Sequence, residues 1–315
     1  MKHKGQLSIL VATLIMILTI VACQSSAQTD IFTHTPLIII TGQEDSAEDF
    51  HMLALNVASP DTDHIHQTIQ GRIDDINAQG GIAIIAHPDA PGFTVTEAEL
   101  KALKGYLGIE VGYTTPPTKW DAVLTDRVER DEPLIWGFMT DDAHREENIG
   151  SRFIVLRMTQ PSKDSVLAAL IEGNFYWGDA PLIKDISLSD KTITITLSSK
   201  ANIKFIKQGG QVVKTVTGTS GEYTVIGDEG YIRIDVESRS PFYQRAGTQP
   251  FRITDALNIN NPYLSSGNWY KGNLHCHSTI SDGELSPEEL IRLYEEKGYS
   301  FLAITDHVSW SILTE

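Results

Sequence analysis

The sequence contains only two cysteines, Cys23 and Cys276, which excludes a disulfide-rich scaffold, so stability must come from a hydrophobic core. Basic residues are also scarce, with 25 Lys and Arg against 41 Asp and Glu, and the net charge is -16. This balance argues against nucleic-acid binding through a basic surface. No internal repeat is found. With 315 residues, of which 41% are hydrophobic, the chain can form one large domain and a small one.

A long apolar run, Leu7 to Ala22, lies at the start of the chain behind Lys2 and Lys4, and polar "QSSAQTD" follows it. This pattern is typical of a targeting segment. The run ends in "IVAC", which resembles the lipobox of bacterial lipoproteins, where cleavage leaves a lipid-modified cysteine. The resemblance implies a signal peptide over 1–22, a location in the bacterial cell envelope and membrane attachment through Cys23. The alternative is an uncleaved membrane anchor.

Short apolar runs alternate with amphipathic stretches from about residue 30 to 178, a pattern typical of βα units around a mostly parallel sheet. The expected strands are "PLIIIT" (36–41), "FHMLALNV" (50–57), "GIAIIA" (81–86), "LGIEV" (107–111) and "LIWGFM" (134–139). Expected helices include "HQTIQGRIDDINAQG" and "TEAELKALKG".

The pattern changes twice further along the chain. Between 180 and 263, short alternating strands separated by Gly, Asp and Ser predict an antiparallel sandwich. From 268 to 315 the α/β character returns, with a strand "KGNLHCH", a helix "SPEELIRLYEEKG" and a strand "SFLAITDH". Ser286 is the expected N-cap of this helix. Two α/β segments therefore flank the sandwich.

Side chains that bind metals follow nearly all of the expected α/β strands; they are Glu44, His87, Glu110, Asp141, Asp142, His144, His275, His277, Asp306 and His307. Functional groups gather at the carboxyl ends of parallel strands, so we expect these side chains to converge. Residues i and i+2 of an extended strand point to the same side, so His275 and His277 could bind one ion together. The sequence therefore predicts a metal centre assembled from both α/β segments.

Several neighbours of these residues allow more than one interpretation. Cys276 should point away from the flanking histidines into packing. Glu110 either supports a ligand or is a carboxylate paired inside the rim, and Asp306 is expected to orient a ligand imidazole. Arg145 is expected to form a surface ion pair with Glu146 or Glu147, and the alternative is contact with a substrate phosphate.

The stretch "GNLHCHSTISDGELSPEELIRLYEEKGYSFLAITDH" resembles the first part of the PHP (polymerase and histidinol phosphatase) family of metal-dependent phosphoesterases. The stretches "GQEDSAEDFHMLAL", "GGIAIIAHP" and "GFMTDDAH" resemble the later motifs of that family. The order differs, because the family's first motifs stand last here. The resemblance implies an α/β fold, a distorted (β/α)7 TIM-like barrel that is circularly permuted, with the sandwich-like domain joining its two segments. The alternative is a misassembled tandem pair of incomplete barrels, which predicts duplicated motifs, and none are duplicated.

The resemblance also implies a ligand set, motif by motif. The first metal would take His275, His277, Glu44 and Asp142. The second would take Glu44, His51 and His87, with Glu44 bridging. A third position, which not all members fill, would take Asp282, His307 and His144. Glu44, Asp142 and His144 are also the candidate catalytic residues.

The implied activity is metal-dependent hydrolysis of a small-molecule phosphate ester by a metal-bridging hydroxide. Two cations about 3.5 to 4 Å apart can activate a shared water and clamp a phosphoryl centre. Mixed imidazole and carboxylate ligands favour two or three ions of Mn, Fe or Zn. Two alternatives stay open: hydrolysis of carboxylic or carbamic esters at the same site, and a non-catalytic metal-containing lipoprotein whose sandwich binds a glycan or a partner.

Overall fold

The computed structural model describes residues 36–46, 50–58, 68–90, 95–112, 116–180, 182–239, 242–255, 258–263 and 266–308, all within one compact unit. The expected signal peptide and Cys23 lie outside the described residues. Among the described residues, no helix combines the length and apolar character needed to span a membrane.

Strands dominate the described part of the chain. They are β1 (Ile38–Ser46), β2 (His51–Leu55), β3 (Ile82–Ala86), β4 (Gly108–Glu110), β5 (Trp136–Phe138), β6 (Phe153–Met158), β7 (Phe175–Gly178), β8 (Ile183–Ser189), β9 (Thr192–Lys207), β10 (Gln211–Thr224), β11 (Tyr231–Ser238), β12 (Gln244–Thr248), β13 (Phe251–Asp255), β14 (Asn258–Asn260), β15 (Asn268–Asn273), β16 (Phe301–Ile304) and β17 (His307–Val308). The α-helices are α1 (Ile69–Ala78), α2 (Glu97–Ala102), α3 (Thr118–Glu129), α4 (Lys163–Glu172) and α5 (Pro287–Glu296).

The strands form one mixed network of pairings. Strands β5, β4 and β3 are parallel neighbours, β2 is antiparallel to β3 and to β1, and β1 is parallel to β16, which is parallel to β15. The network continues antiparallel through β6, β7, β12, β11, β9 and β10. Of the remaining strands, β8 pairs with β9, β13 with β11, β14 with β13 and β17 with β1.

The expected fold, a circularly permuted (β/α)7 TIM-like barrel with a sandwich-like domain between its segments, is wrong. The described residues hold seventeen strands but only five α-helices, and the strands share one mixed sheet. A (β/α)7 barrel needs parallel neighbours, whereas β2 is antiparallel to both β1 and β3. Only four residues separate β1 from β2. Because a parallel crossover needs a dozen residues or more, β2 must return antiparallel.

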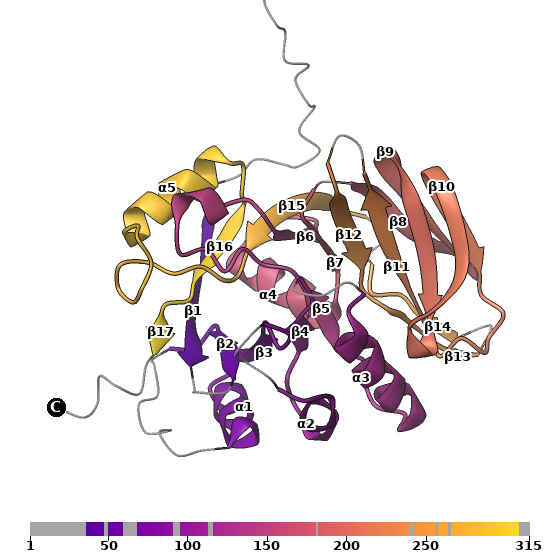
Figure 1. Ribbon diagram of the computed structural model, residues 1–315, viewed down its shortest axis with the longest axis horizontal. Coiled ribbons are helices and arrows are strands. Elements are labelled where there is room, and N and C mark those ends of the chain that lie inside the picture. Colours follow the sequence, from indigo (N-terminus) through magenta and orange to yellow (C-terminus); the bar gives the residue numbers. More distant parts are fainter. Residues whose placement is uncertain are drawn as a thin grey trace, which may run out of the picture. The chain divides into compact units, whose positions relative to one another are not determined.

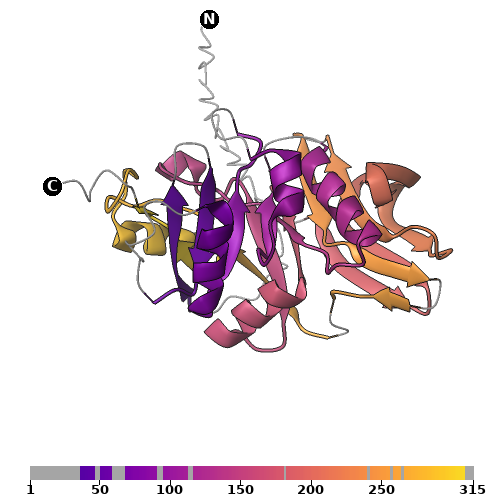
Figure 2. The same ribbon diagram turned by 90° about the horizontal axis from the view of Figure 1, so that it is seen from below.

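Strand β1 joins the two ends of the described chain. Its first half pairs with β16 and its second half with β17, in the registers Ile38 to Phe301 and Glu44 to His307. The indigo strand of the N-terminal part therefore lies beside the yellow strands of the C-terminal part in both ribbon views (Figures 1 and 2). This pairing brings residues more than 250 positions apart in sequence into one sheet.

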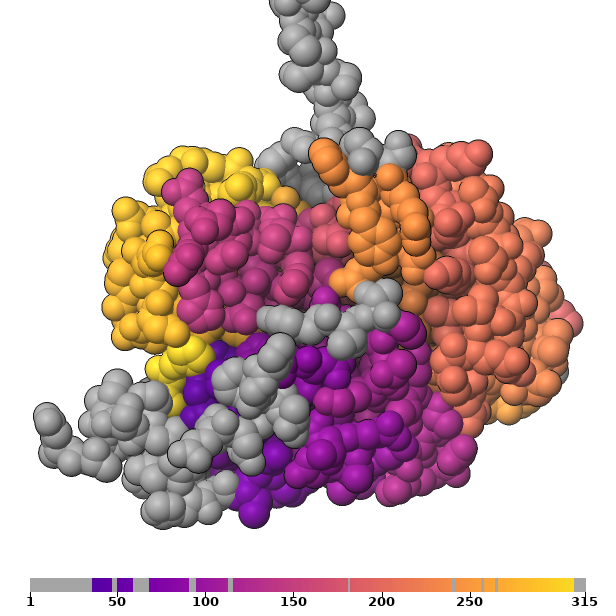
Figure 3. Space-filling model, viewed as in Figure 1, coloured from indigo at the N-terminus to yellow at the C-terminus, as the bar shows by residue number. Residues whose placement is uncertain are grey.

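The antiparallel region β8–β14 packs against α3, and the purple residues of that helix meet the orange strands in the space-filling view (Figure 3). Asp121 of α3 accepts hydrogen bonds from Tyr231 and Arg233 of β11, and all three side chains are buried. On β5, the backbone N–H and C=O of Gly137 both bond to the side chain of Gln249. The β-rich region is thus joined to the rest by buried polar contacts as well as by the β7–β12 pairing.

Helix α5 begins at the cap that the sequence predicts. The Ser286 hydroxyl accepts a hydrogen bond from the N–H of Glu289 at 3.2 Å, and the Glu289 carboxylate accepts one from the N–H of Ser286 at 2.9 Å. We expect Ser286→Ala to lower the free energy of unfolding by about 1 kcal/mol, because an orphan helix donor loses its partner. Urea denaturation measures this. Ser266→Ala, at an exposed position outside the helices, is the control, and an equal loss in both variants would contradict the prediction.

Candidate metal centre

All nine candidate ligands lie in the described part of the chain, and the structure brings them together. Each stands in a strand or in the segment that follows one: Glu44 in β1, His51 at the start of β2, His87 after β3, Asp142 and His144 after β5, His275, His277 and Asp282 after β15, and His307 in β17. They form groups whose ligand atoms all lie within 4.8 Å of one another. The expectation of a cofactor is therefore confirmed in its coarse form, since these groups could hold metal ions.

A short backbone contact aligns the segment of Asp142 and His144 with the segment of His275 and His277. Ala143 and Cys276 form an isolated parallel bridge, in which the N–H of Asp142 donates to the C=O of His275 at 3.0 Å and the N–H of His277 donates to the C=O of Ala143 at 2.8 Å. Cys276 is fully buried on the other side, with its Sγ 3.5 Å from the C=O of Ala303. The alternation of side chains thus directs both histidines to one site and the thiol into the core.

Glu44 lies at the centre of a set of side chains that we call the inner cluster: Glu44, His51, His87, Asp142, His275 and His277. Its Oε1 is 2.8 Å from Nδ1 of His51 and 3.1 Å from Nε2 of His87. Its Oε2 is 3.3 Å from Nε2 of His275 and 3.4 Å from Nε2 of His277. Oε2 also lies 3.1 Å from Nδ1 of His307. The two oxygens of one buried carboxylate therefore face two different sets of imidazoles.

Asp142 completes the inner cluster on the side of the paired histidines. Its Oδ1 is 3.2 Å from Nε2 of both His275 and His277, and these two nitrogens are 3.1 Å apart. The inner cluster is nearly closed to solvent, with the side chains of Glu44 and His275 exposed by 1% and 0%. Carboxylates buried to this degree need positive charge beside them.

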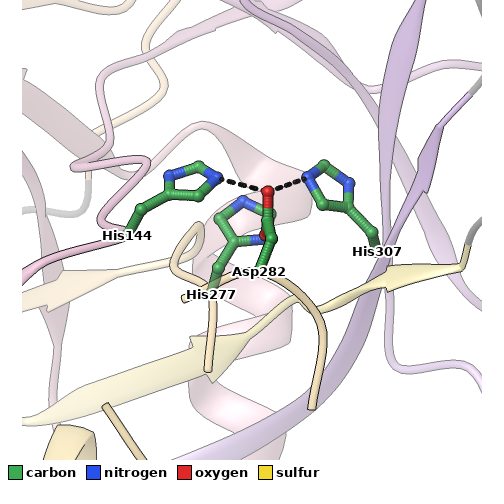
Figure 4. A group of neighbouring side chains, drawn as sticks. All are labelled: His144, His277, Asp282 and His307. Carbon is green, nitrogen blue, oxygen red and sulfur yellow. Dashed lines mark ion pairs between the residues drawn. The ribbon is translucent and has the colours of Figure 1, made fainter. Parts of the chain in front are cut away.

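A second group, the outer cluster, contains His144, His277, Asp282 and His307 (Figure 4). Asp282 Oδ2 is 3.4 Å from Nε2 of His144 and 3.5 Å from Nε2 of His307. His277 belongs to both clusters, because its Nδ1 is 3.6 Å from Asp282 Oδ1. The outer cluster is more open than the inner one, with the side chains of Asp282 and His144 exposed by 54% and 35%.

The inner cluster shifts the pKa values of its members strongly. Burial alone would raise the pKa of Glu44, but the charge of His275 and the hydrogen bonds with His51 and His87 hold this pKa well below its usual value. Burial would lower the pKa of His275, but Asp142, Glu44 and Glu110 raise it well above its usual value. Burial lowers the pKa of His277, and the charge of His275 adds to this effect. The acids around His275 thus favour its positively charged form.

The inner cluster fits a metal ion by its donor set. Glu44 Oε2 accepts no hydrogen bond from the described residues, although it is buried and three imidazole nitrogens surround it. His275 uses its Nδ1 to contact Glu110 at 2.9 Å, which in the neutral ring leaves the Nε2 lone pair directed at Glu44, Asp142 and His277. Convergent imidazole nitrogens and carboxylate oxygens suit Mn, Fe or Zn.

The supporting residues differ in part from the sequence expectations. Glu110 contacts His275, a candidate ligand, and so supports the cluster. Asp306 was expected to orient an imidazole, but its oxygens accept hydrogen bonds from Ser278 and Ser281 instead. Arg145 pairs with Glu284 at 3.1 Å. An acid at the end of a strand was the sequence signal for Glu110, whereas the serines carry no such signal.

Asp141 and Asn273 form a buried support. Asp141 was expected among the metal-binding side chains but belongs to no metal-capable group of the described residues, and Asn273 was not expected at all. The Asp141 carboxylate accepts hydrogen bonds from the N–H groups of Gly150 and Arg152 and from the Tyr294 hydroxyl. Asn273 accepts from the N–H of Asp141 and donates to the C=O of His275. These bonds link the segment that carries Asp142 to the segment that carries His275.

Comparison with known proteins gives local similarity only. No family model and no solved structure matches the chain. Two curated proteins match over 37 residues at 54% identity, the DNA polymerase/3'-5' exonuclease PolX of Bacillus subtilis and a 5'-3' exoribonuclease of Haemophilus influenzae. The matched stretch is 12% of this chain and covers 6% and 14% of those proteins. The chain is therefore similar to both in one short segment.

Proposed function

We propose that the protein is a metal-dependent hydrolase of phosphate esters whose site is related to that of the PHP family. The observation that carries this proposal is the position of Glu44. It belongs to one metal-capable group with His51 and His87 and to another with His275 and His277. A carboxylate shared by two ion positions is the ligand arrangement expected of a two-metal hydrolase. Both locally similar proteins are named for exonuclease activity, which fits phosphoryl chemistry.

The inner cluster would hold two ions, which when bound can activate water and neutralise charge on a phosphoryl group. Glu44 would orient both ions, and its burial keeps bulk water from competing for its oxygens. Asp142 and His275 would fix the geometry on one side, and His51 and His87 on the other. No Ser or Cys nucleophile is required, and the burial that raises the pKa of Cys276 argues against a thiolate.

The outer cluster would face the substrate. His144 lies at the solvent edge of the site, where an imidazole can hold a proton or deliver one to a leaving oxygen. Asp282 and His307 border the same opening and could hold a third ion. The substrate class that suits this arrangement is a small phosphate ester, because the acidic composition of the chain disfavours a polyanion.

Metal removal tests the proposal. We expect the full chain to be purified with Mn, Fe or Zn, to hydrolyse p-nitrophenyl phosphate or bis-p-nitrophenyl phosphate, to lose this activity with a chelator and to regain it with added metal. p-Nitrophenyl acetate separates phosphoryl from acyl transfer. Preferred hydrolysis of the acetate would favour a carboxylester hydrolase, and a metal-loaded chain that is inactive on all three substrates would contradict the proposal.

A further inference from the structure

Two carboxylates border the metal centre without belonging to any of its metal-capable groups. Glu110 lies at the end of β4 and is 2% exposed, and half-buried Asp306 lies just before β17. Each of them accepts three hydrogen bonds. Acids with their oxygens occupied in this way cannot turn freely, so they are suited to hold the groups that donate to them.

Glu110 contacts the inner cluster. Its Oε1 lies 2.9 Å from Nδ1 of His275 and also accepts a hydrogen bond from Thr140. Its Oε2 accepts a hydrogen bond from the backbone N–H of His87 at 2.9 Å. His87 has a φ of +25°, which is strained for a residue other than glycine and needs support from its surroundings. Glu110 thus fixes the ring of one inner ligand and the backbone of another.

Asp306 contacts the turn that carries Asp282. Its Oδ1 accepts hydrogen bonds from the N–H of Ser278 at 2.7 Å and from the Ser281 hydroxyl at 2.7 Å, and its Oδ2 accepts one from the Ser278 hydroxyl at 2.6 Å. The turn closes through a bond from the N–H of Gly283 to the C=O of Ser278 at 2.9 Å. Asp282 lies inside this turn and is half exposed, so its position depends on the turn.

We propose that the metal centre consists of two halves that share His277 but are supported separately, with Glu110 as the positioning residue of the inner cluster and Asp306 as that of the outer cluster. The inference rests on the metal binding proposed above. Because Glu44 and His275 of the inner cluster are buried, whereas Asp282 and His144 of the outer cluster are open to water, inner ions bind tightly and an outer ion binds weakly and exchanges. Each half then loses affinity when its own supporting acid is removed.

Titration of Mn2+ into the metal-stripped full chain, with free Mn2+ measured by electron paramagnetic resonance, tests this. We expect two affinity classes in the wild type. Glu110→Ala should weaken the tight class by about 10 to 100-fold and leave the weak class unchanged, because loss of a ligand's supporting partner has that effect on metal affinity. Asp306→Ala should weaken the weak class and leave the tight class unchanged.

Two further variants are controls for misfolding. Glu110→Gln keeps the size of the side chain, and its tight class should also weaken. Ser278→Ala combined with Ser281→Ala removes hydroxyl donors to Asp306 without changing an acid, and it should weaken the weak class alone. Circular dichroism of each metal-free variant checks the fold.

The outcomes separate this inference from the proposed function. A wild-type chain that binds no Mn2+ contradicts the metal centre itself. A wild-type chain with a single affinity class, or equal weakening of both classes by Glu110→Ala and by Asp306→Ala, leaves the proposed hydrolase intact and overturns the separate support of the two halves.

Discussion

Glu44→Gln is expected to lower both the metal affinity and the rate of phosphate-ester hydrolysis by at least about 100-fold while the chain stays folded. Removal of an outer partner of a metal ligand already costs about 10 to 100-fold, so the loss of a shared ligand should cost more. Glutamine has nearly the same shape as glutamate, so the packing around this buried residue is retained. Its neutral amide nevertheless removes the charge that faces five imidazoles.

The same substitution at the rim provides a matched control for Glu44→Gln. Glu284 is exposed, pairs with Arg145 and lies outside the metal-capable groups of the described residues, so Glu284→Gln should keep its metal and activity. His275→Ala should act like Glu44→Gln. Metal content by mass spectrometry, initial rates and urea denaturation separate a functional loss from unfolding. Full activity in Glu44→Gln would refute the central role of this carboxylate.

Apolar runs were sufficient to locate the first five strands. Each of the five expected strands overlaps an observed one, because buried strands need continuous apolar residues. Strands β2 to β5 lie within the expected ranges, whereas β1 continues past the expected 36–41 as far as Ser46. The direction of pairing could not be taken from the same runs. Strand β2 was read as a further βα unit, but its closeness to β1 in sequence forces an antiparallel return. The sequence signal for the antiparallel direction of β2 was thus the length of the connection to β1 and not the apolar run itself.

The continuity of the sheet was also not predictable from patterns. Strands β6 and β7 link the α/β segments to the antiparallel region, since β15 pairs with β6 and β12 pairs with β7. Periodicity reports which residues of a strand are buried, but not which strand lies beside it. A change of pattern near residue 180 therefore suggested a separate sandwich where the pairing is continuous.

The members of the site were easier to predict than the fold, because their chemistry depends on local position. His275 and His277 had to face the same side in an extended segment, and they do. The supports were harder to predict, because Asn273 and Tyr294 act through contacts with Asp141, which lies in a segment distant in sequence. The side chains converge at the strand ends although the expected barrel does not form. The reason is that β3, β4 and β5 are still parallel, so their carboxyl ends lie at the same edge of the sheet.

Arg233→Met is expected to lower the free energy of unfolding by about 3 to 5 kcal/mol, the largest effect on stability that we expect from a single residue outside the metal centre. Arg233 is fully buried, and its guanidinium donates to both oxygens of Asp121 at 2.8 and 2.7 Å and also to Asp235. Methionine fills similar space but leaves two carboxylates without their cation. Such uncompensated charge is costly in a poorly solvated position.

Companion variants of Arg233 distinguish lost charge from lost packing. Arg233→Lys keeps the charge but cannot bond both oxygens of Asp121 at once, so its loss should be intermediate. Adding Asp121→Asn and Asp235→Asn to Arg233→Met removes the stranded charges and should recover part of the stability. Urea denaturation at fixed metal concentration measures all of these. If the triple variant is no more stable than Arg233→Met alone, then the contact between α3 and β11 is held by shape, including the stacking of Arg233 on Trp120, and not by the buried ion pairs.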